Sequence, residues 1–382
     1  MDKSYYIYDF KKNVKLPDGT KYLDSVIYRD LFHIDYFKNN QWKPIYGRIV
    51  TYSNYSVLSI IKNKIKNIKN IVRKDHFYSL IKEHDFCLPY INFDISSQNF
   101  KHNIEKFLSK HSKNSLWFLK KSAEVSYGGY DVFPIIYDQN VINNIDTFVQ
   151  ESNKYKKYES NNFTLQRGIR NPILLDGYKF DMRTYGLVVF CENQCEFYYY
   201  KKGLLRKTRT LYDKNNIDRS NMLTNTTFHT QGVENTEYVS LTEIFEDCES
   251  DSYLDCINNN KKMFFSDSKS ITRKDFYNKY FPKSAQIWKN IALTIKNNFD
   301  LSDKYGYHLL GLDLIVDSKT EEMFVLEINS SPAIYYPDNP KLKGLHKNME
   351  YDMFKYYFDI TINAIRDKKL IKHDLGNWQW IN

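Results

Sequence analysis

The sequence predicts a mixed α/β (α+β) fold built largely from antiparallel sheets. From about residue 166 onward strand-like runs dominate, among them 180–190 and 196–201, and helical spacing returns at 284–299. Strands that follow one another across short polar connections pair as hairpins, and hairpins build antiparallel sheets. A doubly wound sheet fits this order less well.

The chain length predicts two or three domains. Its 382 residues are enough for a sizeable core. We expect a small N-terminal unit at 1–75, a central domain at 76–165 and a C-terminal domain at 166–382.

The N-terminal unit is expected to hold a strand at 47–52 and an amphipathic helix. Ile61, Ile65, Ile68 and Val72 recur at helical spacing, and the neighbouring lysines lie outside that stripe. These lysines therefore indicate the solvated face of a helix and not a nucleic-acid site.

The central domain begins with a predicted helix at 103–109 and a strand at 115–120. The strand ends at Lys120 and runs into a small-residue loop at 122–129. A lysine beside such a loop can hold phosphates, because backbone amides approach the ligand closely. The alternative is a lysine that precedes an ordinary turn.

The charge balance permits an acidic partner. The net charge is +9, from 55 basic and 46 acidic residues, which suits an acidic protein tail or a polyphosphate as well as an undedicated basic surface. No nucleic-acid motif is found, and no apolar run reaches the roughly 18 residues of a membrane span. We expect a cytoplasmic protein without nucleic-acid or membrane partners. The scattered cysteines predict thiols and not disulfides or a zinc site.

Two adjacent strands near the C-terminus present oxygen ligands. Glu327 and Asn329 are two residues apart and project to one face of a strand, while Asp313 lies in the preceding apolar run; the polar stretch 317–322 connects the two as a hairpin. Two carboxylates and an amide oxygen suit Mg²⁺, which commonly bridges to nucleotide phosphates. The alternative is a strand-starting aspartate and a glutamate that pairs with a lysine.

A second charged pattern lies in GYKFDMRTYGLVVF. Lys179, Asp181 and Arg183 alternate with apolar neighbours, so they share one strand face. Such a face is usually solvated, but the apolar continuation indicates a strand that enters the core. Lysine and arginine in the resulting cleft would suit phosphoryl oxygens. The following turn carries Arg206, which is a carboxylate or phosphate clamp or a surface residue. The short polar cluster 223–226 is typical of a turn or a helix cap.

These motifs, in this order, resemble the tubulin-tyrosine ligase family, whose catalytic part has an ATP-grasp fold. The resemblance runs from about residue 45 to 340. The matching motifs are WFLKKSAEVSYGG, LQRGIRNPILL, KFDMR, GLLR, MLTN, GLDLIVD and LEINSSP. The resemblance implies a nucleotide held between two mixed or antiparallel sheets in the central and C-terminal domains.

The resemblance also implies contacts with ATP. Lys74 and Lys120 would contact its phosphates, and Gln166, Arg167 and Ile169 would form the adenine hinge.

The remaining roles follow from the charged strand and the hairpin. Lys179, Asp181 and Arg183 would line the site of phosphoryl transfer, with Arg206 near the phosphates or the incoming amino acid. Further positions implied are Thr224 and Asn225 for the nucleotide, and Asp313, Glu327 and Asn329 for magnesium.

The sequence departs from the family at a few positions. The glycine loop reads Gly128-Gly129-Tyr130-Asp131 in place of Gly-x-Gly-Ile, and Arg167 replaces a usual lysine. The Asp313 to Glu327 spacing is about one residue longer than in the family, which a longer hairpin turn would absorb.

The family chemistry implies an ATP- and Mg²⁺-dependent ligase that adds a free amino acid to a protein carboxylate, of the tubulin-tail tyrosination or glutamylation type. An acidic tubulin tail would suit the basic chain, which we expect to be a monomer. Alternatives are an ATP-grasp ligase with a non-tubulin acceptor and a catalytically dead module that binds ATP or a protein tail.

Overall fold

The computed structural model describes residues 65–122, 131–153, 160–191, 193–224, 262–265, 269–302, 305–330, 332 and 369–381, together with the backbone of strands at 4–7, 13–15, 21–23, 42–43, 48–53, 56–62 and 242–245. The predicted mixed α/β fold with largely antiparallel sheets is confirmed. Strand pairs are antiparallel throughout the described ladders except for the parallel contacts β1–β4 and β6–β18.

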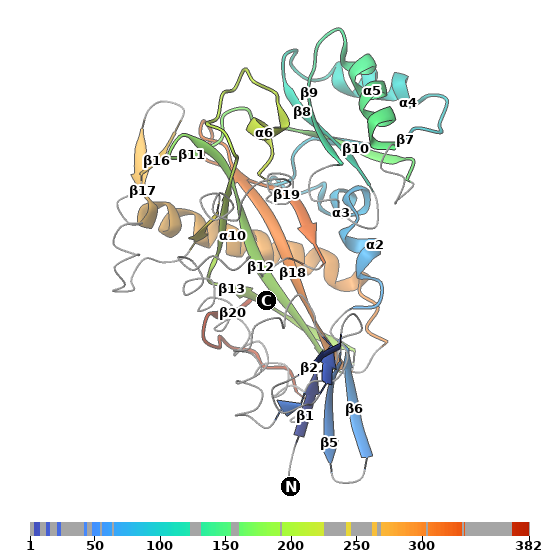
Figure 1. Cartoon of the computed structure of the whole chain (residues 1–382), viewed down its shortest axis with the longest axis vertical. Helices are drawn as coiled ribbons and strands as arrows, with labels where there is room; N and C mark the ends of the chain where they lie inside the picture. The colour runs from blue at the N-terminus through green and yellow to red at the C-terminus, as the bar shows by residue number, and fades with distance from the viewer. Residues whose placement is uncertain are drawn as a thin grey trace.

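A large sheet of 14 strands runs the length of the molecule (Figure 1). Its strands are β1 (Ser4–Ile7), β4 (Trp42–Lys43), β5 (Arg48–Ser53), β6 (Ser56–Lys62), β11 (Leu174–Leu175), β12 (Tyr178–Cys191), β13 (Gln194–Tyr200), β14 (Gly203–Lys207), β15 (Thr242–Phe245), β16 (Lys262–Phe264), β17 (Ser270–Thr272), β18 (Tyr305–Val316), β19 (Met323–Asn329) and β20 (Trp378–Ile381).

A small sheet lies beside one end of the large one, with strand order β7-β10-β8-β9. A separate hairpin pairs β2 with β3. The strands are β7 (Tyr90–Asp94), β8 (Leu116–Lys121), β9 (Val132–Ile136), β10 (Asn162–Arg167), β2 (Asn13–Lys15) and β3 (Lys21–Leu23). The helices are α2 (Ile68–Val72), α3 (Lys74–Ile81), α4 (Phe100–Leu108), α5 (Val141–Asn153), α6 (Arg219–Met222), α10 (Arg273–Ile295) and the 3-10 turn η1 (Lys296–Asn298).

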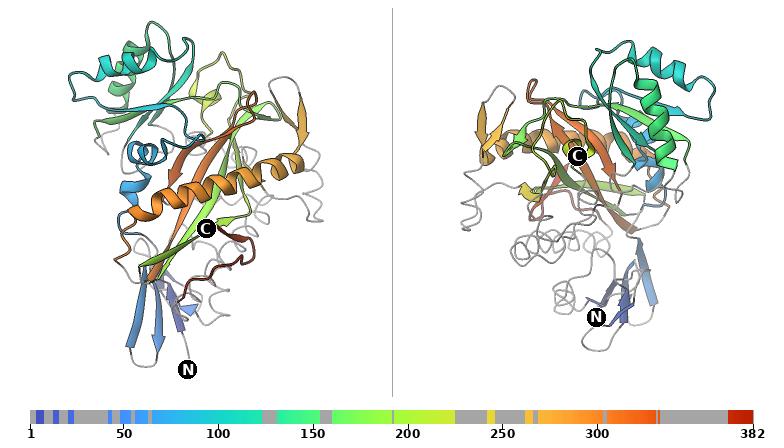
Figure 2. Two further views of the ribbon diagram at one scale, coloured as in Figure 1. Left: turned by 180° about the vertical axis from the view of Figure 1, so that it is seen from behind. Right: turned by 45° about the horizontal axis from the view of Figure 1, so that its top comes forward.

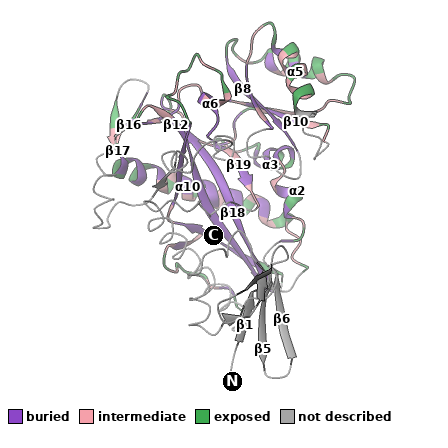
Figure 3. Cartoon of the chain, viewed as in Figure 1, coloured by how far each residue is buried: buried purple, intermediate pink, exposed green. Residues whose placement is uncertain are grey.

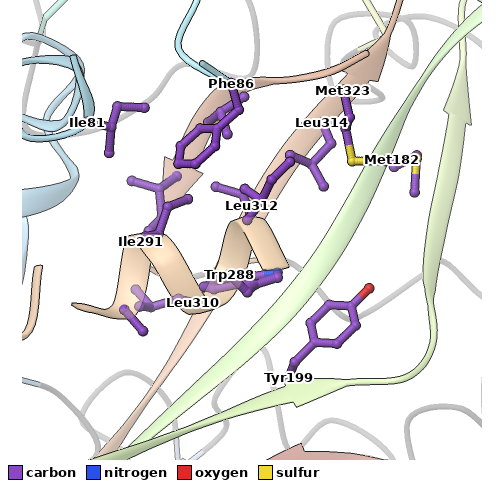
Figure 4. Packing of buried hydrophobic residues seen from close by; sticks show 14 of the residues in the cluster. Ile81, Phe86, Met182, Tyr199, Trp288, Ile291, Leu310, Leu312, Leu314 and Met323 are labelled. Atoms are coloured by element: carbon purple, nitrogen blue, oxygen red, sulfur yellow. The ribbon is translucent and has the colours of Figure 1, made fainter. Parts of the chain in front are cut away.

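Helix α10 covers one face of the large sheet (Figure 2). It begins at a Thr272 cap whose side chain accepts a hydrogen bond from the Asp275 amide, and it continues through Pro282. The helix is therefore longer than the predicted 284–299. Trp288 packs against the sheet and donates its indole N–H to Thr184 at 2.9 Å. Figure 4 shows this ring among the apolar side chains of β18 and β12.

The strands that the site needs are buried on both faces, as Figure 3 shows for β12 and β18. Phe180 and Met182 of β12 belong to the main core, beneath which α10 lies. The charged residues that alternate with them, Lys179, Asp181 and Arg183, point to the other face of the strand, because successive side chains of a strand alternate between faces. A separate apolar cluster fills the space between the small sheet and helices α4 and α5.

The predicted helix across Ile61 to Val72 is only partly correct. Ile61 lies in β6, where it pairs with Ile49 of β5, and the helix α2 begins at Ile68. Pairing with β5 decides the conformation here, because β-branched residues also suit a strand. The other predicted strands, at 47–52, 115–120, 180–190 and 196–201, match β5, β8, β12 and β13.

Candidate active site

The centre of the site is a line of ion pairs along β12, between β14 and β18. Asp181 lies opposite Arg206 of β14, and Arg183 lies opposite Asp313 of β18. Arg206 donates to both oxygens of Asp181, at 2.7 and 2.6 Å, and its Nη2 lies 2.8 Å from Asp313. Arg183 holds Asp313 through Nε and, at 3.0 Å, through Nη2. The network is buried, so its charges depend on one another.

The hairpin of β18 and β19 brings together the predicted metal ligands. Asp313 pairs with Glu327, and Gly311 pairs with Asn329, whose amide lies 3.4 Å from the Glu327 carboxyl. Burial raises the pKa of Glu327, Lys74 opposes this rise, and the Asp313 carboxylate adds to it. Burial also tends to raise the pKa of Asp313, but Arg183 and Arg206 hold the pKa of that carboxyl well below its usual range.

A β-bulge lies in β19 between the partners of Asp313 and Leu314. Asp313 pairs with Glu327 whereas Leu314 pairs with Val325, so Leu326 has no partner in the ladder. Because a bulge places two neighbouring residues on the same face, Leu326 and Glu327 both line the cavity of the site.

Lys120 joins the small sheet to the large one. It is the penultimate residue of β8, and its ammonium donates to Gln166 Oε1 at 2.6 Å, to the Tyr78 hydroxyl at 2.9 Å and to the Leu326 carbonyl at 2.9 Å. Gln166 in turn donates to the Val325 carbonyl at 3.3 Å. Burial lowers the pKa of Lys120 to about 8.

Two further lysines face the site. Lys74, the first residue of α3, lies 3.2 Å from Asp131, directly before β9. Burial tends to lower the pKa of Lys74, but the carboxylates of Asp131 and Glu327 raise this pKa above its ordinary value. Lys179 donates to the Met222 carbonyl at 2.6 Å, and burial lowers its pKa to about 8.

A cavity of about 80 Å³ lies at this site, and its lining has a charged and an apolar half. Lys74, Gln166, Arg183 and Asn329 are not among the lining residues. The charged half contains the Asp181–Arg206 pair together with both hairpin carboxylates. The apolar half lies between the two sheets. Its apolar lining comprises Phe118, Val132, Ile169, Met222, Leu223, Ile315 and Leu326. A ligand that fits both halves combines a flat apolar ring with anionic groups, as a nucleotide does.

The structure places the other predicted residues differently. Thr224 donates its hydroxyl to Asp181. Arg167 does not line the cavity; its guanidinium lies over the Trp117 ring, 5.4 Å from the centroid. Asn225 and the glycine loop at 123–130 lie outside the described residues.

Sequence reasoning missed Tyr78 and Asp131. Tyr78 follows Lys74 by four residues, so the helical period would place it beside that lysine. Asp131 carries no comparable signal, because only the fold of the β8–β9 hairpin brings it to α3. One of its carboxylate oxygens is buried without a hydrogen-bond partner.

The donor set of the hairpin fits a hard cation. Asp313 is buried and Glu327 is half-buried, and the two carboxyl groups are in contact; a divalent ion would relieve the repulsion between them when both are ionised. Over the described ranges, no group of three or more His, Cys, Asp or Glu forms a metal cluster, so a cation here would rely on Asn329 and ligand oxygens as well. Within the same part of the chain, no helix is long and apolar enough to cross a membrane.

Comparisons with known proteins show which sequences the chain is similar to. The chain is 25% identical to the protein polyglycylase TTLL10 of Macaca fascicularis over 62% of its own length and 37% of the relative. It is 26% identical to the tubulin polyglutamylase TTLL5 of Mus musculus over 74% of its length and 20% of the relative. It is also 25% identical to the inactive polyglycylase TTLL10 of Homo sapiens over 62% of its length and 34% of that relative.

The aligned region thus spans well under half of each of these relatives. The family profile described as "Tubulin-tyrosine ligase family" matches residues 53–366, which contain every element of the site. The mixed α/β architecture is consistent with the ATP-grasp-like fold of that family. On the match across most of its length, the chain belongs to the tubulin-tyrosine ligase family.

Proposed function

We propose that this chain is an ATP-dependent carboxylate–amine ligase that joins a free amino acid to a carboxylate of a protein. The observation that carries the proposal is the position of Arg206, which contacts Asp181 and Asp313 at once. It lies at the charged end of a cavity whose other end is apolar. Family membership supports the same activity.

The two halves of the cavity suit the two parts of ATP. The apolar lining, with Ile169 and Leu326, would hold the adenine ring. Gln166 is bonded to Lys120 next to this lining and would meet the edge of the ring. Lys120, Lys179 and the arginines would meet the phosphates, because phosphate oxygens accept charge-assisted hydrogen bonds best from such donors.

Magnesium would be held by Asp313, Glu327 and Asn329. When bound there, Mg²⁺ neutralises charge on the phosphoryl oxygens during transfer. Arg183 and Arg206 fix the Asp313 carboxylate in place, and Lys74 balances the charge near Glu327. The protein residues thus orient the ligands before the nucleotide arrives.

The proposed reaction has two steps. A carboxylate oxygen of the acceptor attacks the γ-phosphorus of ATP, and the bond to the β-phosphate oxygen breaks to release ADP. The amine of the amino acid then attacks the acyl carbon, releases inorganic phosphate and loses a proton. Arg183, Arg206 and the lysines stabilise the negative charge that develops on phosphoryl oxygens.

The named relatives favour glycine or glutamate as the amino acid, since their names carry glycylation and glutamylation. An acidic tubulin tail is the proposed acceptor, and the net charge of +9 supports an acidic partner. A monomer in the cytosol and the three-part division at residues 75 and 165 belong to the same proposal. The second of these boundaries lies within β10.

A second candidate is a catalytically inactive module that binds ATP or a protein tail. It is favoured by the similarity to a relative named as inactive. The two candidates differ in ADP release, which only the ligase catalyses.

Intact-mass analysis of tubulin tests the proposal. The chain is incubated with tubulin, Mg-ATP and glycine, glutamate or tyrosine, and ADP is measured in parallel. Added glycine or glutamate residues are expected with the wild type and with Glu322→Gln, an exposed control, and not with Glu327→Gln. ADP release without added mass would move the acceptor to another protein. ATP binding with neither product would establish the inactive module, and the absence of nucleotide binding would refute both candidates.

A further inference from the structure

Helix α3 brings two side chains, Lys74 and Tyr78, against residues of the site, and only the first of them was predicted. Lys74 begins the helix and Tyr78 follows one turn later, so both side chains lie on the same face. Tyr78 is fully buried. Its hydroxyl meets three groups of the nucleotide end of the site: Lys120, Gln166 and Leu326.

The contacts of Tyr78 complete a closed network around Lys120. An ammonium has three protons, and the Lys120 ammonium donates to the Tyr78 hydroxyl, Gln166 Oε1 and the Leu326 carbonyl. The Tyr78 hydroxyl donates in turn to the Leu326 carbonyl and lies 3.1 Å from Gln166 Oε1.

The Leu326 carbonyl needs these donors because of the bulge. Leu326 has no partner in the β18 ladder, so side chains must supply its hydrogen bonds. If Lys120 turns toward a phosphate, it gives up at least one protein acceptor. A carbonyl that is partly shielded from water and left without a donor is costly, whereas the Tyr78 hydroxyl keeps the part-buried Leu326 carbonyl bonded when the lysine leaves.

We propose that Tyr78 is a positioning residue of the nucleotide site, whose hydroxyl holds the Leu326 carbonyl and Gln166 in place while Lys120 turns to the phosphates of ATP. The inference rests on the proposed function, because it assigns Lys120 and Gln166 to ATP. Without the hydroxyl, Leu326 depends on Lys120 alone, and the lysine is less available to the nucleotide.

The test compares Tyr78→Phe with Tyr199→Phe. Tyr199 is also fully buried, and its hydroxyl makes one hydrogen bond, of 2.7 Å, to Ser284 of α10. Neither residue lines the cavity. We expect Tyr78→Phe to raise the Kd and the KM for Mg-ATP about tenfold, with a smaller change in kcat, as the loss of one buried hydrogen bond would do. Tyr199→Phe should keep the wild-type Kd.

A double-mutant cycle with Lys120→Met separates positioning from a general effect. If Tyr78 acts through Lys120, the double variant binds ATP no more weakly than Lys120→Met alone. If the Kd of the double variant rises by the product of the two single fold-changes, the inference is overturned. A wild-type Kd in Tyr78→Phe would overturn it as well. Loss of the fold in Tyr78→Phe, with Tyr199→Phe stable, would make Tyr78 a structural residue and overturn it too.

The same titrations distinguish the two proposals. A folded wild-type chain that binds no nucleotide overturns the proposed function together with this inference. A wild-type chain that binds Mg-ATP, with Tyr78→Phe binding equally well, overturns the inference alone.

Discussion

Arg183 and Asp313 lie directly opposite each other in the β12–β18 ladder, and their side chains form a buried ion pair with two hydrogen bonds. Because Arg206 shares the same carboxylate, Asp313 serves two arginines and is also the proposed ligand for magnesium. Removal of its charge should therefore affect both the fold and the chemistry.

We expect Asp313→Asn to unfold more easily than the wild type by about 3–5 kcal/mol, since Arg183 then remains buried without its carboxylate partner while Arg206 keeps only Asp181. Urea unfolding monitored by tryptophan fluorescence measures this difference. Asp317→Asn, in the hairpin outside the cavity, is the control and should change stability little. Equal stability of the two variants would contradict the role of Asp313 in the network.

We expect Glu327→Gln to abolish ligation while the fold survives. Glutamine keeps the volume of the side chain and removes a half-buried charge that faces Asp313, so stability should not fall. Loss of the carboxylate removes a metal ligand. Product mass and thermal unfolding are measured side by side, with Glu322→Gln from the same hairpin as the control. Full activity in Glu327→Gln would refute the metal site.

The affinity for ATP should fall as the pH rises through about 8. Burial lowers the pKa of Lys120 to about 8, so its ammonium, which would meet the phosphates, loses its proton in that range. The pKa of the free protein governs kcat/KM, and we expect an alkaline limb there. Lys120→Arg stays charged and should lack this limb, although its affinity is lower. Lys179, whose pKa is also lowered to about 8 by burial, should keep part of the limb in that variant.

Two glycines of the long strands allow packing and site effects to be separated. A Cβ at Gly186 would lie 2.5 Å from the Trp288 ring, and one at Gly311 would lie 2.7 Å from Pro332 and 3.1 Å from Arg183. We expect both alanine variants to lose about 1–3 kcal/mol of stability through overpacking. Only Gly311→Ala should also raise the KM for ATP, because its methyl group would displace Arg183. If the two alanine variants had the same KM, this displacement would be contradicted.

The fold class could be predicted because strands and their connections leave local patterns. The alternation in β12 placed Lys179, Asp181 and Arg183 on one face, and the structure puts all three on the buried side opposite Phe180 and Met182. The helix through Ile61 failed, because pairing with β5 decided a segment whose residues suit either state.

The partners of the charged residues could not be predicted. Arg206 was expected as a clamp or a surface residue, and only the β12–β14 register shows that it faces Asp181. The Lys74–Asp131 contact joins positions that are far apart in the sequence, and the bulge at Leu326 depends on how β19 pairs with β18. Such contacts between distant segments leave no local signal.

The strand β18 links the site to the N-terminal strands as one continuous element. Gly306 pairs with Lys62 of β6, and Asp313 lies further along the same strand. At about 3.3 Å per residue, the strand separates these positions by roughly 23 Å. A strand paired along this length bends little, so a polypeptide that touches both β6 and the ion pairs must bridge a nearly constant span. Under the proposed function, an acceptor tail that contacts β6 while its carboxylate lies at the ion pairs would have to span this distance.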